Sequence, residues 1–322
     1  MSITHDQVTL ERVDCESCGS SQSETLFAVA DSYGTSTLEF PVVKCSGCGL
    51  VYVNPRPTED VIGRFYPDEY FEKEVFHSAH PNRLIGSVDK RRLRDIARFS
   101  SVGRMLDVGC GNGRFLSFAG MEGWCTLGIE VAPQAAGYAR DHYGLEVLES
   151  GLLEAGLPSG QFDVVTMWGV IEHLHHPKAA IREVARLLKP EGLLVTLAPN
   201  IASTQFRAFG SRWHLLDVPR HLYHFSTATL SAMAGDEGLS LAWGRYYAQE
   251  HDLGNLISSL ETILHANDQA GTRQTGNLEP PSRKWTPRRL AMGVLRRTSP
   301  ILARVMAGRR HSAAMELYFL KR

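Results

Sequence analysis

Three alternating glycines begin two residues after an acid in the stretch Met-Leu-Asp-Val-Gly-Cys-Gly-Asn-Gly, residues 105–113. An apolar run leads into Asp107 and a helix-compatible segment follows at residues 114–121, so the pattern predicts a strand, a tight turn and a helix. Glycine adopts backbone conformations that other residues avoid, and it lets a ligand approach the bare main chain. The unpaired N–H groups at the start of the helix favour an anionic group such as a carboxylate. The glycines of this predicted binding loop are Gly109, Gly111 and Gly113.

A second acidic residue is expected to face this loop from the neighbouring strand. The short apolar run at residues 125–130 ends in Glu130, 17 residues after Gly113. That is near the spacing at which a doubly wound sheet places an acid on the hydroxyls of a ribose. The dinucleotide fingerprint needs a glycine where this chain has Arg114, so the pattern does not predict a dinucleotide.

The elements that position these residues alternate between strands and helices along the chain. Such alternation predicts an α/β fold with a parallel sheet covered on both faces. Because ligands bind at the carboxyl ends of parallel strands, Gly109, Glu130 and the pair Glu172-His173 should meet at one edge of the sheet. The further predicted elements are a helix from Pro133, a strand at 162–168, a helix at 177–188, a strand at 193–197, a helix from Thr227 and a last, antiparallel strand at 315–320.

Four motifs together resemble the class I S-adenosylmethionine (SAM)-dependent methyltransferases across about residues 90–250. They are Asp-x-Gly-x-Gly-x-Gly, Gly-Ile-Glu, Phe-Asp-Val-Val and Leu-Lys-Pro-Glu-Gly. The resemblance implies a seven-stranded Rossmann-like sheet with SAM as the methyl donor. It also implies that the three glycines admit the methionine part of SAM, that Asp107 orients its amino group and that Glu130 binds its ribose.

The expected adenine contact departs from the family pattern. Many members carry an acid after the third strand that accepts a hydrogen bond from the adenine amino group, and here that position falls near Ser150 and Gly151. We therefore expect Ser150 or the backbone to bind adenine, with Glu149 or Glu154 as substitutes only if the loop is shifted. Trp168, at the end of the predicted fourth strand, completes the predicted cofactor contacts.

Two Cys-x-x-Cys pairs lie near the N-terminus, with 26 residues between them. Each pair places two thiolates on one turn, and a glycine after the second cysteine relieves the backbone. Four thiolates suit a tetrahedral Zn²⁺ ion, which would stabilise a segment too small to bury a core of its own. A redox or iron centre is the alternative, but redox dithiols rarely come as matched pairs. The predicted ligands are Cys15, Cys18, Cys45 and Cys48.

The order of motifs after the cysteines is similar to zinc-ribbon-headed bacterial methyltransferases, which often act on sugars, lipids and secondary metabolites. Val-Asn-Pro-Arg-Pro follows the second pair, and Tyr-Pro-x-x-Tyr comes next. The order predicts a zinc-ribbon head over residues 1–75 and a methyltransferase domain over residues 76–322. Tyr66 and Tyr70 either pack between these two parts or form a lid that contacts the substrate.

Methyl transfer from SAM mainly requires alignment of the nucleophile, the methyl group and the sulfur, and a base helps when the acceptor is a hydroxyl or an acidic C–H. One candidate pair, Glu172-His173, lies just past the predicted fourth strand. Its Val-Ile-Glu-His string resembles the metal-using small-RNA 2′-O-methyltransferases and ubiquinone-biosynthesis O-methyltransferases, which have a further Glu three residues earlier. Gly169 stands there, so we expect Glu172 and His173 to shape the cofactor pocket, with a catalytic metal as the less favoured alternative.

A second cluster of candidate residues crowds onto the predicted loop at 213–226. Its His-Leu-x-x-Phe-Ser portion is similar to sugar C-methyltransferases, which have a Glu-His pair there with the His as base. This chain keeps His221 but has Arg220 in place of the Glu. We predict that His221 is the base and that Arg220 holds an anionic or hydroxyl-rich substrate. Trp213 and His224 are the other predicted substrate contacts, although His224 also fits a packing role above the sheet.

Basic residues gather near the end of the chain: residues 283–322 hold 11 of the 34 lysines and arginines and one of the 35 acids. We expect residues 267–312 to be a loop followed by a basic helical insert before the last strand. The insert either covers the active site or, through residues 283–310, contacts an anionic membrane or a lipid-linked glycan. Nucleic acid is not the expected partner, because the predicted head is acidic rather than basic.

The composition favours a cytoplasmic enzyme, membrane-peripheral if the basic insert binds lipid, since no apolar run approaches the length of a membrane span. We predict methylation of a hydroxyl or carbon of a small or carrier-linked acceptor, with a sugar, glycolipid or secondary metabolite as the favoured class. The alternatives are an RNA-modifying methyltransferase and a non-catalytic SAM-fold binding protein.

Overall fold

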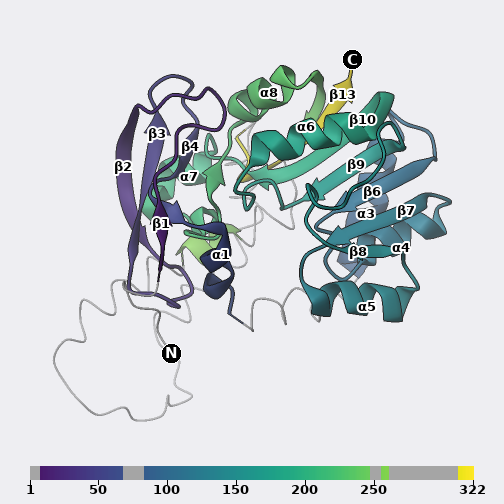
Figure 1. Ribbon diagram of the computed structural model, residues 1–322, viewed down its shortest axis with the longest axis horizontal. Helices are drawn as coiled ribbons and strands as arrows, with labels where there is room; N and C mark the ends of the chain where they lie inside the picture. The colour runs from purple at the N-terminus through teal and green to yellow at the C-terminus, as the bar shows by residue number, and fades with distance from the viewer. Residues whose placement is uncertain (1–7, 68–82, 247–254, 261–310) are drawn as a thin grey trace, which may run out of the picture.

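The computed structural model describes residues 8–67, 83–246, 255–260 and 311–322. Within them, a small N-terminal head lies beside a larger α/β part (Figure 1). Tyr70 and residues 283–310 of the predicted basic insert lie outside the described residues. The division of the chain at residue 75 stays a prediction.

The α/β part is built on one seven-stranded mixed sheet, which confirms the predicted fold class. Its strand order is β12-β13-β10-β9-β6-β7-β8, and β13 runs antiparallel to both of its neighbours. The remaining pairs are parallel, as crossover connections through helices require. The strands are β6 (Arg104–Val108), β7 (Cys125–Glu130), β8 (Val147–Glu149), β9 (Phe162–Trp168), β10 (Leu188–Pro199), β12 (Leu239–Arg245) and β13 (Ala314–Lys321).

Helices cover both faces of this sheet, because successive strand residues point to opposite sides. Val164 packs with helices α3, α4 and α5, whereas its neighbour Val165 packs with α6 and α8. The capping box of α8, in which Ser226 and Thr229 bond each other's backbone, confirms the predicted start at Thr227. The helices of the α/β part are α3 (Arg83–Ile96), α4 (Arg114–Met121), α5 (Pro133–Tyr143), α6 (Pro177–Leu187), α7 (Thr204–Phe209) and α8 (Thr227–Asp236).

The head contains a four-stranded antiparallel sheet of order β11-β4-β3-β2. Three of its strands are N-terminal: β2 (Ser23–Ala30), β3 (Glu39–Cys45) and β4 (Val51–Val53). The fourth, β11 (Tyr223–His224), comes from the loop that follows α7, and Tyr223 pairs with Tyr52. The head sheet is therefore completed by the loop that carries His221, the predicted base. A short pair, β1 (Leu10–Glu11) with β5 (Arg56–Pro57), and helix α1 (Glu59–Ile62) complete the head.

One buried arginine joins the head to the α/β part. The Arg56 side chain is 2 % exposed and pairs with Glu11, with 2.8 Å between Nε and Oε1. Its Nη1 donates to the backbone oxygen of His175 at 2.9 Å and to the Tyr223 hydroxyl at 2.8 Å.

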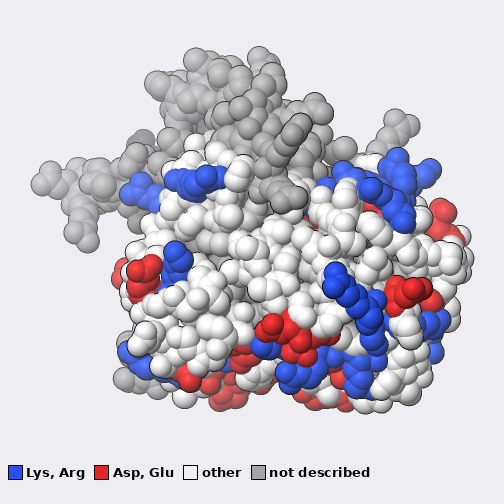
Figure 2. All heavy atoms as spheres, turned by 90° about the horizontal axis from the view of Figure 1, so that it is seen from above, with Lys and Arg blue, Asp and Glu red and all other residues white. Residues whose placement is uncertain are grey.

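Charged side chains of both signs are mixed on the face of the described residues seen in Figure 2. No helix among the described residues is long and apolar enough to cross a membrane.

Candidate active site

The glycine loop connects β6 to α4 at the carboxyl edge of the sheet, where the sequence predicted it. All three glycines have positive φ angles, 65° at Gly109, 55° at Gly111 and 77° at Gly113. A Cβ atom on Gly113 would lie 2.7 Å from the Cβ of Ala139 in α5, so this glycine lets two helices approach. A Cβ on Gly111 would meet nothing within 4 Å, so the main chain there faces open space that a ligand can enter.

Glu130 faces this loop from the end of β7. Its Oε2 accepts a hydrogen bond from the Gly111 N–H at 2.8 Å, and its Oε1 accepts one from the Ala132 N–H at 2.8 Å. The carboxylate therefore fixes the loop, and each oxygen keeps a further lone pair for a ligand hydroxyl.

Asp107 is almost fully enclosed below the loop, with 2 % of its surface exposed. The Thr166 hydroxyl donates to its Oδ1 at 2.6 Å. Burial raises the pKa of the Asp107 carboxyl to about 7, against the opposing effects of Thr166 and of the Arg92 charge. A buried carboxyl that titrates near neutrality is typical of functional sites.

Trp168 lies beside this pocket, at the end of β9. The Arg92 guanidinium of α3 stacks 3.9 Å from the centre of its ring, and Phe115 meets it edge-on at 5.2 Å. The indole Nε1 is buried without a hydrogen-bond partner among the described residues. The sequence did not predict a role for Arg92, because it is one of several arginines in α3 and no motif distinguishes it from the others.

Ser150 and its neighbours lie after β8, as the family pattern predicted. The Ser150 hydroxyl donates to the Gly151 carbonyl at 3.2 Å. The Glu154 carboxylate occupies the space that a side chain at Gly151 would need, so an acid does approach this loop. Glu149 instead pairs with Arg140 at 3.0 Å.

The structure brings Glu172, His173 and His221 together above the carboxyl end of β9. The imidazole rings of His173 and His221 lie 4.6 Å apart in an edge-to-face arrangement. Tyr66 reaches this cluster from the head, with its hydroxyl 3.1 Å from His173 Nδ1. One potential ligand atom from each of the three clustered residues lies within 4.8 Å of the others, and Gly169 adds no side chain to them.

Burial keeps these groups uncharged near neutral pH. It raises the pKa of the Glu172 carboxyl to about 8. Burial, reinforced by His221, lowers the pKa of His173 to about 3. Burial also lowers the pKa of His221, although the Asp217 carboxylate acts in the opposite direction. A neutral imidazole is able to accept a proton.

The hydrogen bonds of His221 define which ring nitrogen carries the proton. Its Nδ1 lies 2.9 Å from the backbone oxygen of Leu215. Since a carbonyl oxygen accepts and never donates, Nδ1 carries the hydrogen and Nε2 keeps its lone pair. His221 therefore has the tautomer that a general base requires.

The other predicted residues of this loop are buried in protein contacts. Arg220 is fully buried and pairs with Asp31 and Asp217. His224 has a pKa lowered to about 3, mainly by burial, and Trp213 packs edge-on against Phe206. These contacts fit the packing role that the sequence allowed for His224, and direct substrate contact by the three residues stays a prediction.

The four head cysteines converge as predicted. Their sulfur atoms all lie within 4.8 Å of one another, with Cys15 and Cys48 at 3.5 Å and Cys18 and Cys45 at 3.5 Å. Gly19 and Gly49, which follow the two pairs, have positive φ angles of 71° and 76°. Although burial opposes it, hydrogen bonds from the Cys48 and Gly47 N–H groups lower the pKa of Cys45 to about 7. Thiols so arranged are compatible with a tetrahedral zinc site.

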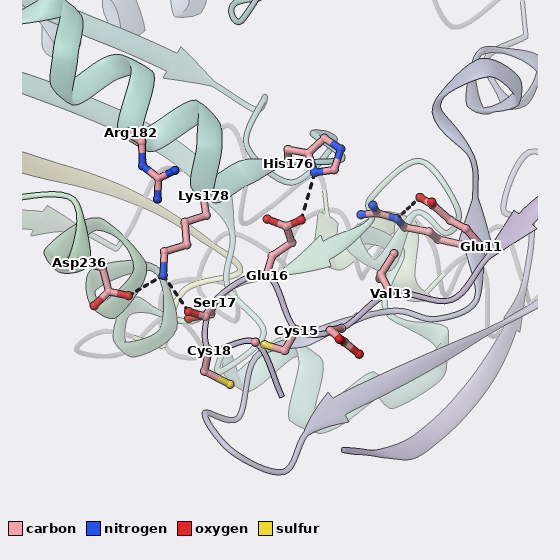
Figure 3. Close-up of a pocket in the computed structure, with 13 residues that line it drawn as sticks. Glu11, Val13, Cys15, Glu16, Ser17, Cys18, His176, Lys178, Arg182 and Asp236 are labelled. Atoms are coloured by element: carbon pink, nitrogen blue, oxygen red, sulfur yellow. Dashed lines mark hydrogen bonds and ion pairs between the residues drawn. The ribbon is translucent and has the colours of Figure 1, made fainter. Parts of the chain in front are cut away.

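A hollow of about 800 Å³ lies between the first cysteine turn and the start of α6 (Figure 3). Its charged side chains are largely paired: Lys178 bonds Asp236 at 2.8 Å and His176 bonds Glu16 at 3.1 Å. Of the predicted site residues, Cys15 and Cys18 alone line it. We therefore regard the hollow as part of the contact between the head and α6.

The sheet order and the glycine loop with its facing carboxylate define a SAM-dependent methyltransferase. A family model described as a methyltransferase domain matches residues 82–242. The ubiquinone biosynthesis O-methyltransferase of Bordetella avium is 31% identical over an alignment of 223 positions, which covers 64% of this chain and 88% of that protein. That of Azoarcus sp. is 31% identical over 150 residues, 43% of this chain and 64% of that protein, so this match spans less than two thirds of the relative.

The structural comparison agrees at the level of the fold. A SAM-dependent methyltransferase from Archaeoglobus fulgidus superposes with a TM-score of 0.51 at 18% identity, covering 79% of this chain and 100% of that one. The protein therefore belongs to the class I SAM-dependent methyltransferases.

Proposed function

We propose that this methyltransferase transfers the methyl group of SAM to a hydroxyl of a small or carrier-linked acceptor, such as a sugar, a glycolipid or a secondary metabolite. A carbon acceptor is the alternative. The observation that carries the proposal is the neutral His221, whose Nε2 is unprotonated and whose ring lies 4.6 Å from that of His173 at the carboxyl edge of the sheet. The O-methyltransferase names of the relatives favour oxygen over carbon.

In this proposal the glycine loop holds SAM. The main chain at Gly109 and Gly111 admits the methionine part, Asp107 binds its ammonium group and Glu130 accepts hydrogen bonds from the ribose. Ser150 contacts the adenine, with Trp168 beside the pocket. SAM supplies an activated methyl group, so the protein mainly aligns the acceptor and removes its proton.

The cluster around His221 suits an uncharged, hydroxyl-bearing acceptor. Glu172, with a pKa near 8, and the two imidazoles carry no net charge at neutral pH. The Arg220 guanidinium is already paired with two carboxylates, so its charge is not available to attract an anionic acceptor. In this proposal Tyr66 and His173, whose hydroxyl and Nδ1 lie 3.1 Å apart, contact the acceptor from the side of the head.

We also propose that the four head cysteines bind one structural Zn²⁺. The sulfur positions support this, because four cysteine sulfurs that converge on one point suit a tetrahedral Zn²⁺ ion.

Transfer of a tritiated methyl group from SAM tests the proposed reaction. We expect label in a panel of hydroxylated sugars, lipid-linked glycans or phenols, and we expect His221→Gln to lower the rate by about 100-fold with unchanged SAM affinity. His176→Gln is the matched control, because this histidine lies at the exposed start of α6 and pairs with Glu16. Label in RNA instead would support the RNA-modifying alternative. A fully active His221→Gln variant would exclude His221 as the base.

A further inference from the structure

We infer that Asp31, in the loop after β2 of the head, is a positioning residue for the acceptor site: through Arg220 it orients the imidazoles of His173 and His221. The expected effect on catalysis rests on the proposed function, whereas the contacts that link Asp31 to the two rings do not depend on it. Asp31 and Arg220 are 189 positions apart in the chain and meet in the interior.

The contact between Asp31 and Arg220 is completely enclosed. Both side chains are 0 % exposed, and Nη2 of Arg220 donates to Oδ1 of Asp31 at 2.8 Å. Asp31 is itself held by its own loop, whose Tyr33 and Ser36 N–H groups donate to its two oxygens at 3.2 Å and 3.1 Å. The carboxylate therefore presents a fixed acceptor to the guanidinium.

Arg220 uses the rest of its guanidinium to fix the catalytic loop. Its Nε and Nη2 donate to Oδ1 of Asp217 at 3.0 Å and 2.9 Å. Its Nη1 donates to the backbone oxygen of Phe65 at 2.6 Å, and Ser32 lies between Arg220 and Asp217 with 2.6 Å to each. A planar guanidinium holds such a set of acceptors in one geometry, which a lysine does not.

Asp217 needs this support because its backbone is in an unusual conformation. Its φ of 36° and ψ of 46° lie in the left-handed region, which non-glycine residues adopt at a cost. The bonds from Arg220 and Ser32 to its side chain stabilise that conformation. The head therefore stabilises the turn that directly precedes the proposed base.

Hydrogen bonds to this turn and to the residues beside it hold both imidazoles in place. The His221 N–H donates to the Asp217 carbonyl at 3.0 Å, and the His221 ring donates to the Leu215 carbonyl at 2.9 Å. His173 Nδ1 lies 3.1 Å from the Arg220 carbonyl, so this ring is fixed by the backbone of the same arginine. A change at Asp31 should therefore reach both rings through Arg220.

The test compares folded Asp31→Asn protein with the wild type by nitrogen NMR of ¹⁵N-histidine-labelled chains. The two ring nitrogens of each histidine report its tautomer directly. We expect the His221 and His173 signals to broaden or to show a second tautomer in Asp31→Asn, and methyl transfer to fall at least about tenfold. SAM affinity should change less than about twofold, because the glycine loop is held by Glu130 of β7 and not through Arg220.

Two further variants make the result specific. Glu24→Gln removes an exposed head carboxylate from β2 and should leave the histidine signals unchanged. Ser32→Ala is the milder second variant, used if Asp31→Asn does not fold, and it should shift the same histidine signals by a smaller amount.

Histidine signals in folded Asp31→Asn and Ser32→Ala that match the wild type would overturn the inference. Failure of the proposed function looks different. In that case His221→Gln keeps full transfer activity, while Asp31→Asn still perturbs the two rings.

Discussion

Two buried carboxyl groups have raised pKa values, one on the proposed cofactor side of the site and one on the proposed acceptor side. Asp107 titrates near 7 beneath the glycine loop, and Glu172 titrates near 8 beside the two histidines. Both shifts come mainly from burial, which disfavours the charged form of an acid. The same physical effect serves different proposed tasks: Asp107 binds a cation of the cofactor, and Glu172 keeps the acceptor side uncharged.

SAM affinity should rise with pH between 5.5 and 7.5. The Asp107 carboxyl must lose its proton to pair with the SAM ammonium group, and in the free protein its pKa is about 7. Below that value binding must release the proton, so affinity should weaken by up to about tenfold per pH unit. Isothermal calorimetry measures both the affinity and the proton release.

Asp107→Asn should bind SAM weakly at every pH in this range, and Glu172→Gln should keep the wild-type profile. A flat profile for the wild type would show that Asp107 does not pair with the ammonium. The contribution of Asp107 to the stability of the free protein has the opposite pH dependence: its raised pKa makes unfolding easier as pH increases from about 4 to about 7.

Among individual residues, the sequence predicted those whose partners lie close to them in the chain. The glycines, Asp107 and Glu130 fall within 24 positions, and their roles follow from one strand-turn-helix unit and the next strand. The role of Arg220 could not be predicted in the same way. Its partner Asp31 is distant in sequence, and no local sequence pattern distinguishes an arginine that is buried against a carboxylate from one that binds a substrate.

Individual elements meet closely where the glycines allow it. The glycine loop makes two distinct demands: Gly111 keeps the main chain open to a ligand, and Gly113 lets α4 approach α5. The sequence pattern alone did not separate these roles, because it shows three equivalent glycines. The separation depends on what a side chain at each position would meet.

Alanine substitutions should separate these two demands. Gly113→Ala should lose about 1–2 kcal/mol from its positive φ and a further 1–3 kcal/mol, roughly, from the clash with Ala139. Gly144→Ala is the matched control, since Gly144 has a similar φ of 65° and open space around it. Gly111→Ala should resemble Gly144→Ala in stability but bind SAM at least about tenfold more weakly.

Denaturant unfolding gives the stability of each variant, and calorimetry gives the SAM affinity. Equal losses of stability for Gly113→Ala and Gly144→Ala would contradict the proposed packing role of Gly113.

The molecule as a whole has its head and α/β part joined across the site. Strand β11 belongs to the head sheet but is continuous with the loop of His221. Arg56 of the head bonds both the Tyr223 hydroxyl of β11 and the backbone oxygen of His175 in the α/β part. The sequence predicted a zinc-ribbon head and a methyltransferase domain in order along the chain. It could not predict that two residues near position 223 would complete the head sheet, because so short a strand has no periodic pattern.

Because of this shared strand, the head and the α/β part should unfold together. Calorimetric melting of zinc-loaded protein should give one transition, and metal analysis should find one zinc per chain. Cys45→Ser should lose the zinc and lower the midpoint of that single transition by at least about 5 °C, because loss of a structural metal is among the most destabilising single changes. Cys125→Ser is the matched control, since Cys125 is an exposed cysteine outside the cluster.

Zinc loss should also weaken methyl transfer more than it weakens SAM binding. Strand β11 pairs with β4 of the head and directly follows His221 and Leu222, so a disordered head should disturb the acceptor site. The glycine loop, in contrast, lies on the other sheet. Two separate transitions, with the larger one unmoved by Cys45→Ser, would show instead that the head folds independently and that its metal has no influence on the acceptor site.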